Sequence, residues 1–197
     1  MKEKERSLIE AAINGRSDAF NEIFRLHQEY LYNLMYQISG DMAKADDLTQ
    51  EAMIQAFRRI NTFRFESSFR TWLSRIAINL FRKECHKSKH DSLCLEKIRI
   101  PESDKGSERV VEKCELQWCI RHNLQNHLPE KFRIVLVLRD LQNLSYKEIS
   151  DIVGYDVSLV KTNIHRARRM FRQLFINGKC KAYADDYLCI CEGILEL

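Results

Sequence analysis

The sequence predicts an all-α protein made of two small helical domains joined by a linker, the second a helix-turn-helix domain. Only 2 Pro and 6 Gly occur in 197 residues, so long helices are easy to build and tight turns are few. Hydrophobic residues, 45% of the chain, recur at helical spacing in both halves. Residues 100–108, between the two blocks, contain a Pro, a Gly and mixed charges, which is typical of a linker.

Four helices are predicted in the first half, which forms a domain over residues 1–90. Their apolar residues recur every three or four positions, and short polar residues that can cap a helix precede two of them. Gly40 and Asp41 are expected to end the second helix. The expected elements are a helix over 7–14, a helix from Ser17 or Asp18 to Gly40, a helix over 44–60, a loop over 61–68, and a helix capped by Ser68.

The second half is predicted as a linker over 91–112, a helical domain over 113–176 and a C-terminal extension over 177–197. Helical periodicity resumes near Val110. A Pro at position 129 separates two helices, because proline cannot continue the preceding one. The second of these helices is expected over 130–140.

A helix-turn-helix is predicted to close the second domain. Ser145 and Glu148 have the spacing of a capping box, and Gly154 with Asp156 makes a short turn. At about 100° per residue, the final helix has an apolar face and an opposite basic face. A basic face in this position favours DNA binding in the major groove over a merely solvated surface. The apolar face contains Val160, Ile164, Ala167, Phe171 and Leu174, and the basic face contains Ser158, Lys161, Thr162, His165, Arg166, Arg168, Arg169 and Arg172.

Aromatic and basic residues alternate in the loop over 61–68 and in the helix that follows it. Surfaces of this composition bind single-stranded DNA, because bases stack on the rings and cations follow the backbone. The competing explanation is that Phe69 and Trp72 pack in the core. The aromatic residues are Phe63, Phe65, Phe69 and Trp72, and the basic residues are Arg64, Arg70, Arg75, Arg82 and Lys83.

Three blocks of sequence occur in a set order along residues 7–175. They are DDLTQEAMIQAF at 46–57, SFRTWLSRIAIN at 68–79, and a group made of LPEKFR at 128–133, LSYKEI at 144–149 and VKTNIHRAR at 160–168. The first resembles the polymerase-binding helix of the extracytoplasmic-function (ECF) sigma factors, the second their promoter-melting helix, and the third their second domain. The chain is therefore similar to a family of DNA-binding subunits that direct bacterial RNA polymerase to promoters.

This resemblance implies three binding sites. The residues that face the clamp helices of core RNA polymerase would be Asp46, Asp47, Gln50 and Glu51. Residues that hold a flipped base and the opened strand of the minus-ten element would be Phe63, Arg64, Phe65, Ser67, Trp72, Arg75, Asn79 and Arg82. Residues that read the minus-thirty-five element would be Ser158, Lys161, Thr162, His165, Arg166, Arg168 and Arg169.

The resemblance also implies partners: core RNA polymerase, promoter DNA and an anti-sigma factor wedged between the two domains. Three positions depart from the family pattern, which leaves the promoter sequence open. Leu159 stands where Thr is usual, Asn163 where Arg is frequent, and Lys83 where Asp is common.

Cysteines in the extension raise the question of a metal site. Cys180, Cys189 and Cys191 lie close together in sequence, and such thiolates could bind zinc or copper(I). The alternative, which the helical spacing of Tyr187 and Ile190 favours, is an extra packed helix in which the cysteines fill space. No metal and no cofactor are predicted.

Other functional classes are less well supported. The sequence shows neither a Gly-rich phosphate loop nor a nucleophile elbow, so no enzyme is predicted. A stand-alone helix-turn-helix regulator is the alternative, but it would need a ligand or receiver domain in the first half. Neither a signal peptide nor an apolar run long enough to span a membrane is visible, so a cytoplasmic protein is expected.

Overall fold

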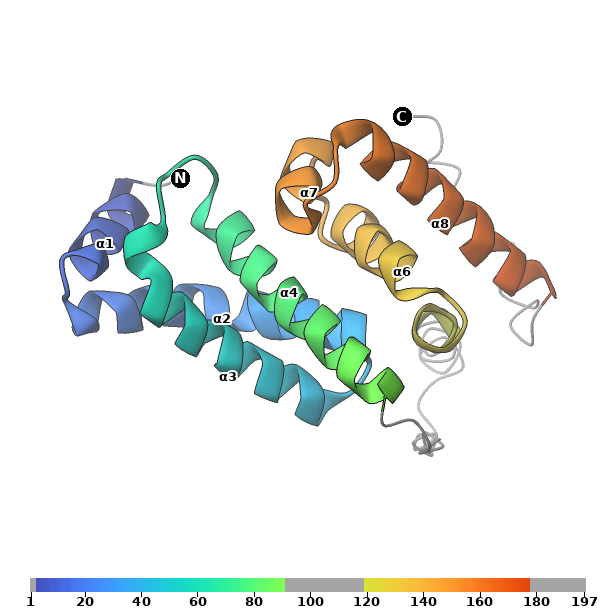
Figure 1. The fold of residues 1–197 in the computed structure, drawn as a ribbon, viewed down its shortest axis with the longest axis horizontal. Coiled ribbons are helices and arrows are strands. Elements are labelled where there is room, and N and C mark those ends of the chain that lie inside the picture. Colours follow the sequence, from blue (N-terminus) through green and yellow to red (C-terminus); the bar gives the residue numbers. More distant parts are fainter. Residues whose placement is uncertain (1–2, 91–118, 178–197) are drawn as a thin grey trace, which may run out of the picture.

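The computed structural model describes residues 3–90, called the first unit below, and residues 119–177, called the second unit (Figure 1). Every regular element within these two ranges is helical, which confirms the all-α prediction. The elements are α1 (Glu3–Ile13), α2 (Ser17–Ser39), α3 (Met42–Arg59), η1 (Ile60–Thr62), α4 (Phe69–His90), a helical stretch over 119–126, α6 (Glu130–Leu136), η2 (Val137–Leu141), α7 (Tyr146–Val153) and α8 (Val157–Asn177).

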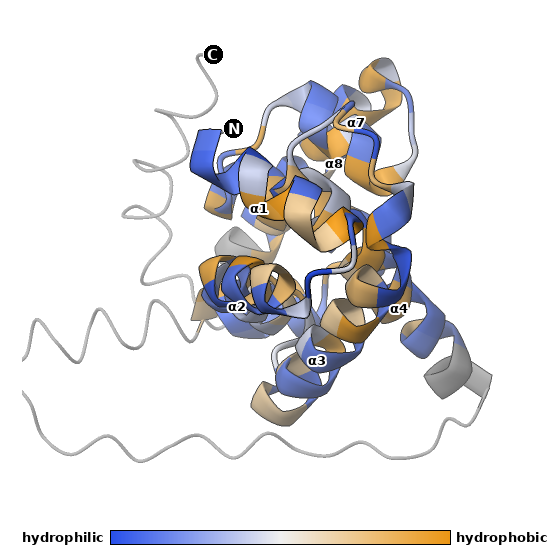
Figure 2. Ribbon diagram, turned by 90° about the vertical axis from the view of Figure 1, so that its left-hand side faces the viewer, coloured by the Kyte–Doolittle hydropathy of each residue, from blue (hydrophilic) through white to orange (hydrophobic). Residues whose placement is uncertain are grey.

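The centre of the first unit is α2, which packs against α1, α3 and α4. Figure 2 shows that hydrophobic and hydrophilic residues alternate along the turns of these helices. The buried stripe of α2 has the predicted helical spacing and includes Leu31 and Ile38. Gly40 ends the helix with a φ of 81°, and its N–H donates to the Tyr36 carbonyl at 2.8 Å. This left-handed residue turns the chain from α2 into α3.

The predicted capping residues of α4 and α2 have different outcomes in the structure. Ser68 Oγ accepts the Thr71 N–H at 3.0 Å and so caps α4, as expected. At the start of α2, Arg16 rather than Ser17 or Asp18 occupies the N-cap position, and its side chain makes no cap hydrogen bond. The Asp18 carboxylate pairs with the Arg16 guanidinium at 3.0 Å instead. Asp18 therefore supplies a negative charge to the first turn, where the helix dipole favours one.

The helix-turn-helix of the second unit has the predicted caps. The Glu148 N–H donates to Ser145 Oγ at 3.3 Å, and the Ser145 N–H donates to Glu148 Oε2 at 2.9 Å, which completes the capping box. Gly154 ends α7 with a φ of 76°, and Asp156 Oδ1 accepts the Leu159 N–H at the start of α8. Because α8 packs on α6 and α7, one of its sides is buried and the other faces solvent.

The helix expected over 130–140 changes its winding part of the way along. It is α-helical to Leu136 and continues as η2, a π-helical segment. The Gln142 N–H donates to the Val137 carbonyl, five residues earlier, at 3.0 Å. Residues 134–138 are all buried, so the hydrophobic pattern has no exposed side there and gives no signal of a wider turn.

The two units pack against each other where α4 meets α7 and where α2 meets η2, a surface called the junction below (Figure 1). Arg82 Nη1 donates to the Val153 carbonyl at the end of α7, at 3.1 Å. Arg70 Nη2 donates to Gln142 Oε1 at 3.2 Å, and Gln142 Nε2 donates to Gln37 Oε1 at 2.8 Å. Long polar side chains therefore connect the units.

Several predicted segments lie outside the described residues. These are the linker over 91–112, the first residues of the domain over 113–176, and nearly all of the extension over 177–197 with Cys180, Cys189 and Cys191. The domain boundaries and the alternatives for these cysteines therefore remain predictions.

Candidate functional site

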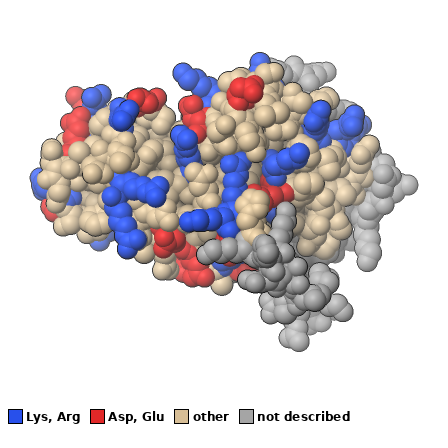
Figure 3. All heavy atoms as spheres, viewed as in Figure 1, with Lys and Arg blue, Asp and Glu red and all other residues tan. Residues whose placement is uncertain are grey.

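The four residues predicted to bind polymerase lie on the solvent side of α3, a group called the α3 strip below. Gln50 Nε2 donates to Asp46 Oδ2 at 2.8 Å, and Glu51 Oε1 accepts from Gln55 Nε2 at 2.9 Å. Acidic side chains gather over α3 on the face seen in Figure 3. Such a surface suits a partner with basic residues. The α3 strip consists of Asp46, Asp47, Gln50 and Glu51, all exposed.

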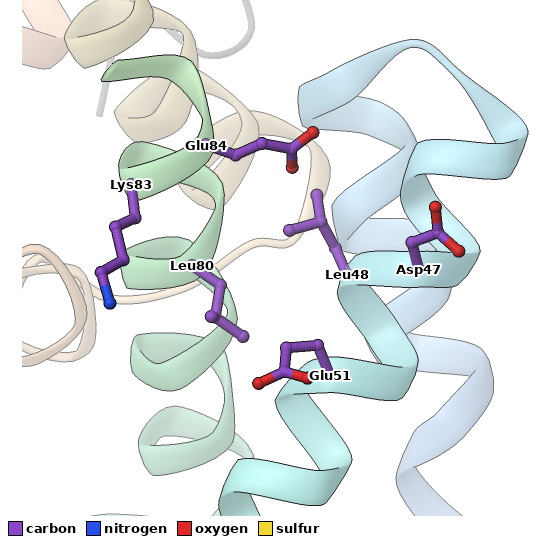
Figure 4. Close-up of a pocket in the computed structure, with 6 residues that line it drawn as sticks. All are labelled: Asp47, Leu48, Glu51, Leu80, Lys83 and Glu84. Atoms are coloured by element: carbon purple, nitrogen blue, oxygen red, sulfur yellow. The ribbon is translucent and has the colours of Figure 1, made fainter. Parts of the chain in front are cut away.

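A pocket of about 230 Å³ lies between α3 and α4, beside the α3 strip (Figure 4). Leu48 and Leu80 point toward each other across it, and Glu51 points from α3 toward α4. The Lys44 ammonium pairs with the Glu84 carboxylate at 3.1 Å and joins the two helices. The pocket could accept an apolar side chain of a partner whose charged residues meet the α3 strip. Its lining residues are Asp47, Leu48, Glu51, Leu80, Lys83 and Glu84.

Two large apolar residues on α3 extend the exposed surface, and sequence reasoning did not select them. Ile54 is 46% exposed and Phe57 is 52% exposed. The Phe57 ring contacts the Phe20 ring edge-on, with centroids 4.9 Å apart. The sequence did indicate their exposure, because both residues lie outside the buried stripe that contains Leu48 and Ala56. Exposed apolar groups beside charged ones are typical of a protein-binding surface.

The loop over 61–68 is organised around one buried ring. Phe63 is only 5% exposed, and its centroid lies 4.9 Å from that of Phe65, 5.6 Å from that of Phe69 and 5.5 Å from that of Trp72. Phe63 packs against these rings, and its predicted stacking on a base stays a prediction. Arg64 is exposed, whereas Phe65, Ser67 and Trp72 are partly buried at the loop surface.

The predicted DNA-facing residues of α4 differ in their access to solvent. Arg75 and Asn79 are exposed on the side opposite the buried Leu73. Arg82 is partly buried at the junction, where it donates to the Val153 carbonyl and lies 5.6 Å from the Tyr155 ring centroid. Arg75 and Asn79 are therefore open to solvent, whereas Arg82 is bound to the backbone of α7.

The basic face of α8 is exposed as predicted, and several Lys and Arg side chains lie over this helix among neutral ones in Figure 3. Thr162 Oγ1 donates to the Ser158 carbonyl at 3.0 Å, within the first turns. Asn163, one of the departures from the family pattern, is buried and faces the core. The exposed predicted residues are Ser158, Lys161, Thr162, His165, Arg166 and Arg169.

Arg168 differs from the other predicted residues of this helix because it is paired within the protein; its contact with DNA stays a prediction. Its Nη2 and Nε donate to the two carboxylate oxygens of Asp140, at 2.5 Å and 3.1 Å, and each side chain is 15% exposed. Asp140 belongs to η2, so the pair ties α8 to the π-helical segment. A guanidinium held at two points is committed to the fold.

Tyr146, at the start of α7, organises cations beside the recognition helix and was not selected from the sequence. The Arg139 guanidinium lies 4.7 Å from its ring centroid, and the Lys161 ammonium lies 5.5 Å from it. Arg139 Nη1 also donates to the Leu144 carbonyl at 2.9 Å. Tyr146 therefore places Lys161, a predicted DNA ligand, through a cation–π contact.

Within residues 3–90 and 119–177, no helix is both long and apolar enough to cross a bilayer. In the same ranges, no group of three or more His, Cys, Asp or Glu side chains is arranged to hold a metal ion.

The fold and these surfaces define a class of protein. A helix-turn-helix with a basic recognition helix follows a helical unit that carries an aromatic and basic loop and an acidic helix. This combination describes a DNA-binding transcription factor with a separate surface for a protein partner.

Comparison with known proteins specifies the family. Residues 23–90 match the model of sigma-70 region 2, and residues 122–171 match that of sigma-70 region 4. The ECF RNA polymerase sigma factor SigW of Bacillus subtilis is 33% identical, over 84% of this chain and 93% of SigW. The ECF RNA polymerase sigma-E factor of Escherichia coli K12 is 32% identical, over 82% of this chain and 88% of that protein.

A solved structure has the same fold. The sigma factor RpoE of Bartonella quintana, crystallised with the anti-sigma factor NepR, superposes with a TM-score of 0.64 at 24% identity, over 79% of this chain and 96% of RpoE. The chain belongs to the ECF family of RNA polymerase sigma factors and is a transcription initiation factor.

Proposed function

We propose that the α3 strip binds core RNA polymerase, that the loop over 61–68 with α4 engages the melted minus-ten element, and that α8 reads the minus-thirty-five element. In this role the chain performs no chemical step, because the polymerase supplies the catalysis. It acts in the cytoplasm, where core polymerase works, and it needs no cofactor.

One observation carries this assignment: three exposed surfaces of different chemistry occur on one chain. The α3 strip is acidic with exposed apolar neighbours, and this suits a protein partner. The loop combines rings with Arg64 and Arg75, which suits an opened strand. The outer face of α8 is basic, and this suits duplex DNA. A stand-alone regulator has no use for the first two surfaces.

An anti-sigma factor is proposed as a further partner. RpoE of Bartonella quintana, which shares this fold, was crystallised with such a factor. The pocket between α3 and α4 supports the idea, because an inhibitor that filled it would also cover Asp47 and Glu51. Inhibition would then follow from competition with polymerase for one surface.

Reconstituted transcription tests the proposal. The double substitution Asp47→Lys and Glu51→Lys should weaken binding to core polymerase at least tenfold, about 1.4 kcal/mol or more, because two acids become two like charges against a basic partner. Both side chains are exposed, so the free energy of unfolding should stay within about 0.5 kcal/mol of wild type. Polymerase pull-down, run-off transcription and urea unfolding are the measurements.

Lys147→Glu, on exposed α7 surface away from the α3 strip, is a matched control for charge reversal. If wild-type protein gives no promoter-dependent transcript with core polymerase while the free chain binds duplex DNA tightly, the stand-alone regulator replaces this proposal.

A further inference from the structure

The backbone of the loop over 61–68 contains one unfavourable conformation. Phe65 has a φ of 58°, in the left-handed region that bulky L-residues avoid. Such a conformation persists only when neighbouring groups hold it, and it is found at functional sites. Neighbouring side chains must therefore hold Phe65 in this conformation.

One neighbour is Phe63, whose ring centroid lies 4.9 Å away at an interplanar angle of 58°. The other is Arg6 of α1, whose guanidinium carbon lies 5.0 Å from the centre of the Phe65 ring. Arg6 Nε donates to Glu10 Oε1 at 2.9 Å in an exposed pair one turn apart on α1, which favours this direction of the cation. Phe65 is thus held between a buried ring and an oriented guanidinium, while part of it stays exposed.

Arg6 can hold the loop only if α1 is itself fixed. Ile9 is fully buried, and α1 packs on α2 and on η1, the turn that leads into the loop. Figure 1 shows α1 beside the start of that loop. Glu5, next to Arg6, bonds His27 Nε2 of α2 at 3.0 Å, and both side chains are largely buried. Lys4 pairs with Glu22 at 3.2 Å on the exposed side.

We propose that Arg6 is a positioning residue for promoter opening: its guanidinium holds the Phe65 ring in the left-handed conformer and so sets the shape of the surface that receives the melted base. The inference rests on the proposed function of the loop. It assigns a role to α1, which precedes the segment matched by the region 2 model at residue 23.

The expected defect is specific, because Arg6 touches neither the α3 strip nor α8. Without the cation, Phe65 can leave the strained conformer, and the loop loses its shape for the base. Binding to polymerase and to the minus-thirty-five element should be unchanged, whereas strand opening and base preference at the minus-ten element should suffer.

The experiment uses the full chain with core polymerase. The probe is a promoter duplex selected by wild-type holoenzyme from a library randomised at both elements, together with its single-base variants in the minus-ten element. Arg6→Ala should lower the yield of open complex, read by permanganate reactivity of unpaired thymines, about twofold to fivefold, the range expected for loss of one exposed cation–π contact. It should also reduce the spread of yields among the minus-ten variants.

Three further single variants and one double variant separate positioning from general destabilisation. Arg6→Lys keeps a cation and should retain most of the base preference, whereas Arg6→Met keeps length without charge and should behave like Arg6→Ala. Lys4→Ala removes an ion pair from the same helix and should match wild type. In a Phe65→Gly background, Arg6→Ala should have no further effect, since no ring remains to be held.

The proposal is overturned if Arg6→Ala, or Arg6→Met should the alanine variant not fold, opens all variants with the wild-type pattern. An equal loss for Arg6→Lys and Arg6→Ala also overturns it. Failure of the proposed function looks different, because wild-type protein would then give no promoter-dependent open complex at all.

Discussion

Arg168 and Arg166 are two residues apart on α8, but they meet different surroundings. Arg168 is bound at two points by Asp140 and is 15% exposed, whereas Arg166 faces solvent. Arg168→Ala leaves a poorly solvated carboxylate on η2, and breaking such a pair costs about 3 kcal/mol. Arg166→Ala should leave the free energy of unfolding within about 0.5 kcal/mol of wild type but weaken minus-thirty-five binding by about 1–3 kcal/mol if it makes a base contact.

Urea unfolding of both variants, with binding of holoenzyme to the selected duplex, checks this contrast. Equal unfolding midpoints for Arg168→Ala and wild type would show that the ion pair does not stabilise the domain.

His27 should make the stability of the first unit depend on pH. Burial holds the pKa of this imidazole below its ordinary value of about 6.5, against the opposing attraction of Glu5; Arg70 lowers it further. Below pH 6.5 the unfolded chain therefore binds more protons than the folded chain. The contribution of His27 to the free energy of unfolding is fully present above pH 6.5. It is lost as the pH falls toward the lower pKa of the folded state. His27→Gln should flatten the dependence of the unfolding free energy between pH 7 and pH 5.

Urea titrations at several pH values provide the measurement, and Gln28→His, at an exposed neighbour, serves as a control that adds an ordinary imidazole. The same slope in wild type and His27→Gln would assign the pH dependence to other groups.

Within the loop over 61–68, the two phenylalanines should respond differently to truncation. Phe63 is buried among three rings, so Phe63→Ala should cost about 3–5 kcal/mol of folding free energy. Phe65 is partly exposed, so Phe65→Ala should mainly impair promoter opening, by tenfold or more if a base stacks on it. Unfolding in urea and permanganate footprinting separate these effects. Equal opening by wild type and Phe65→Ala would remove the ring from the mechanism.

The helical elements show where sequence reasoning is sufficient. Caps such as Ser68, Ser145 and Gly154 act within one turn of chain, so local sequence predicts them. The π-helical η2 was not predicted, because its winding depends on a segment buried on every side. The exposed faces of α3 and α8 followed from helical periodicity. Periodicity did not predict the burial of Phe63, Arg82 and Arg168, because these side chains contact residues of other elements.

For the whole molecule, proteolysis should distinguish the two units from the segment between them. Limited digestion should cut first within the predicted linker over 91–112, since a segment rich in charge with a Pro and a Gly is accessible to proteases. The helices α2, α3 and α4 share a buried core and should resist longer. Mass spectrometry of early fragments locates the cuts. A first cut between residues 48 and 60 would contradict the two-domain organisation.

The junction has a consequence for the order of events at a promoter. Arg82 Nη1 is committed to the Val153 carbonyl, and Arg70 Nε and Arg82 Nη2 are buried with no hydrogen-bond partner among the described residues. Buried donors without acceptors weaken an interface. If Arg82 supports the opened strand as proposed, strand capture requires α7 to release it first. The affinity of the free chain for single-stranded DNA is then lowered by the fraction of molecules with closed units. A binding event that separates the two units would therefore allow the chain to open promoter DNA.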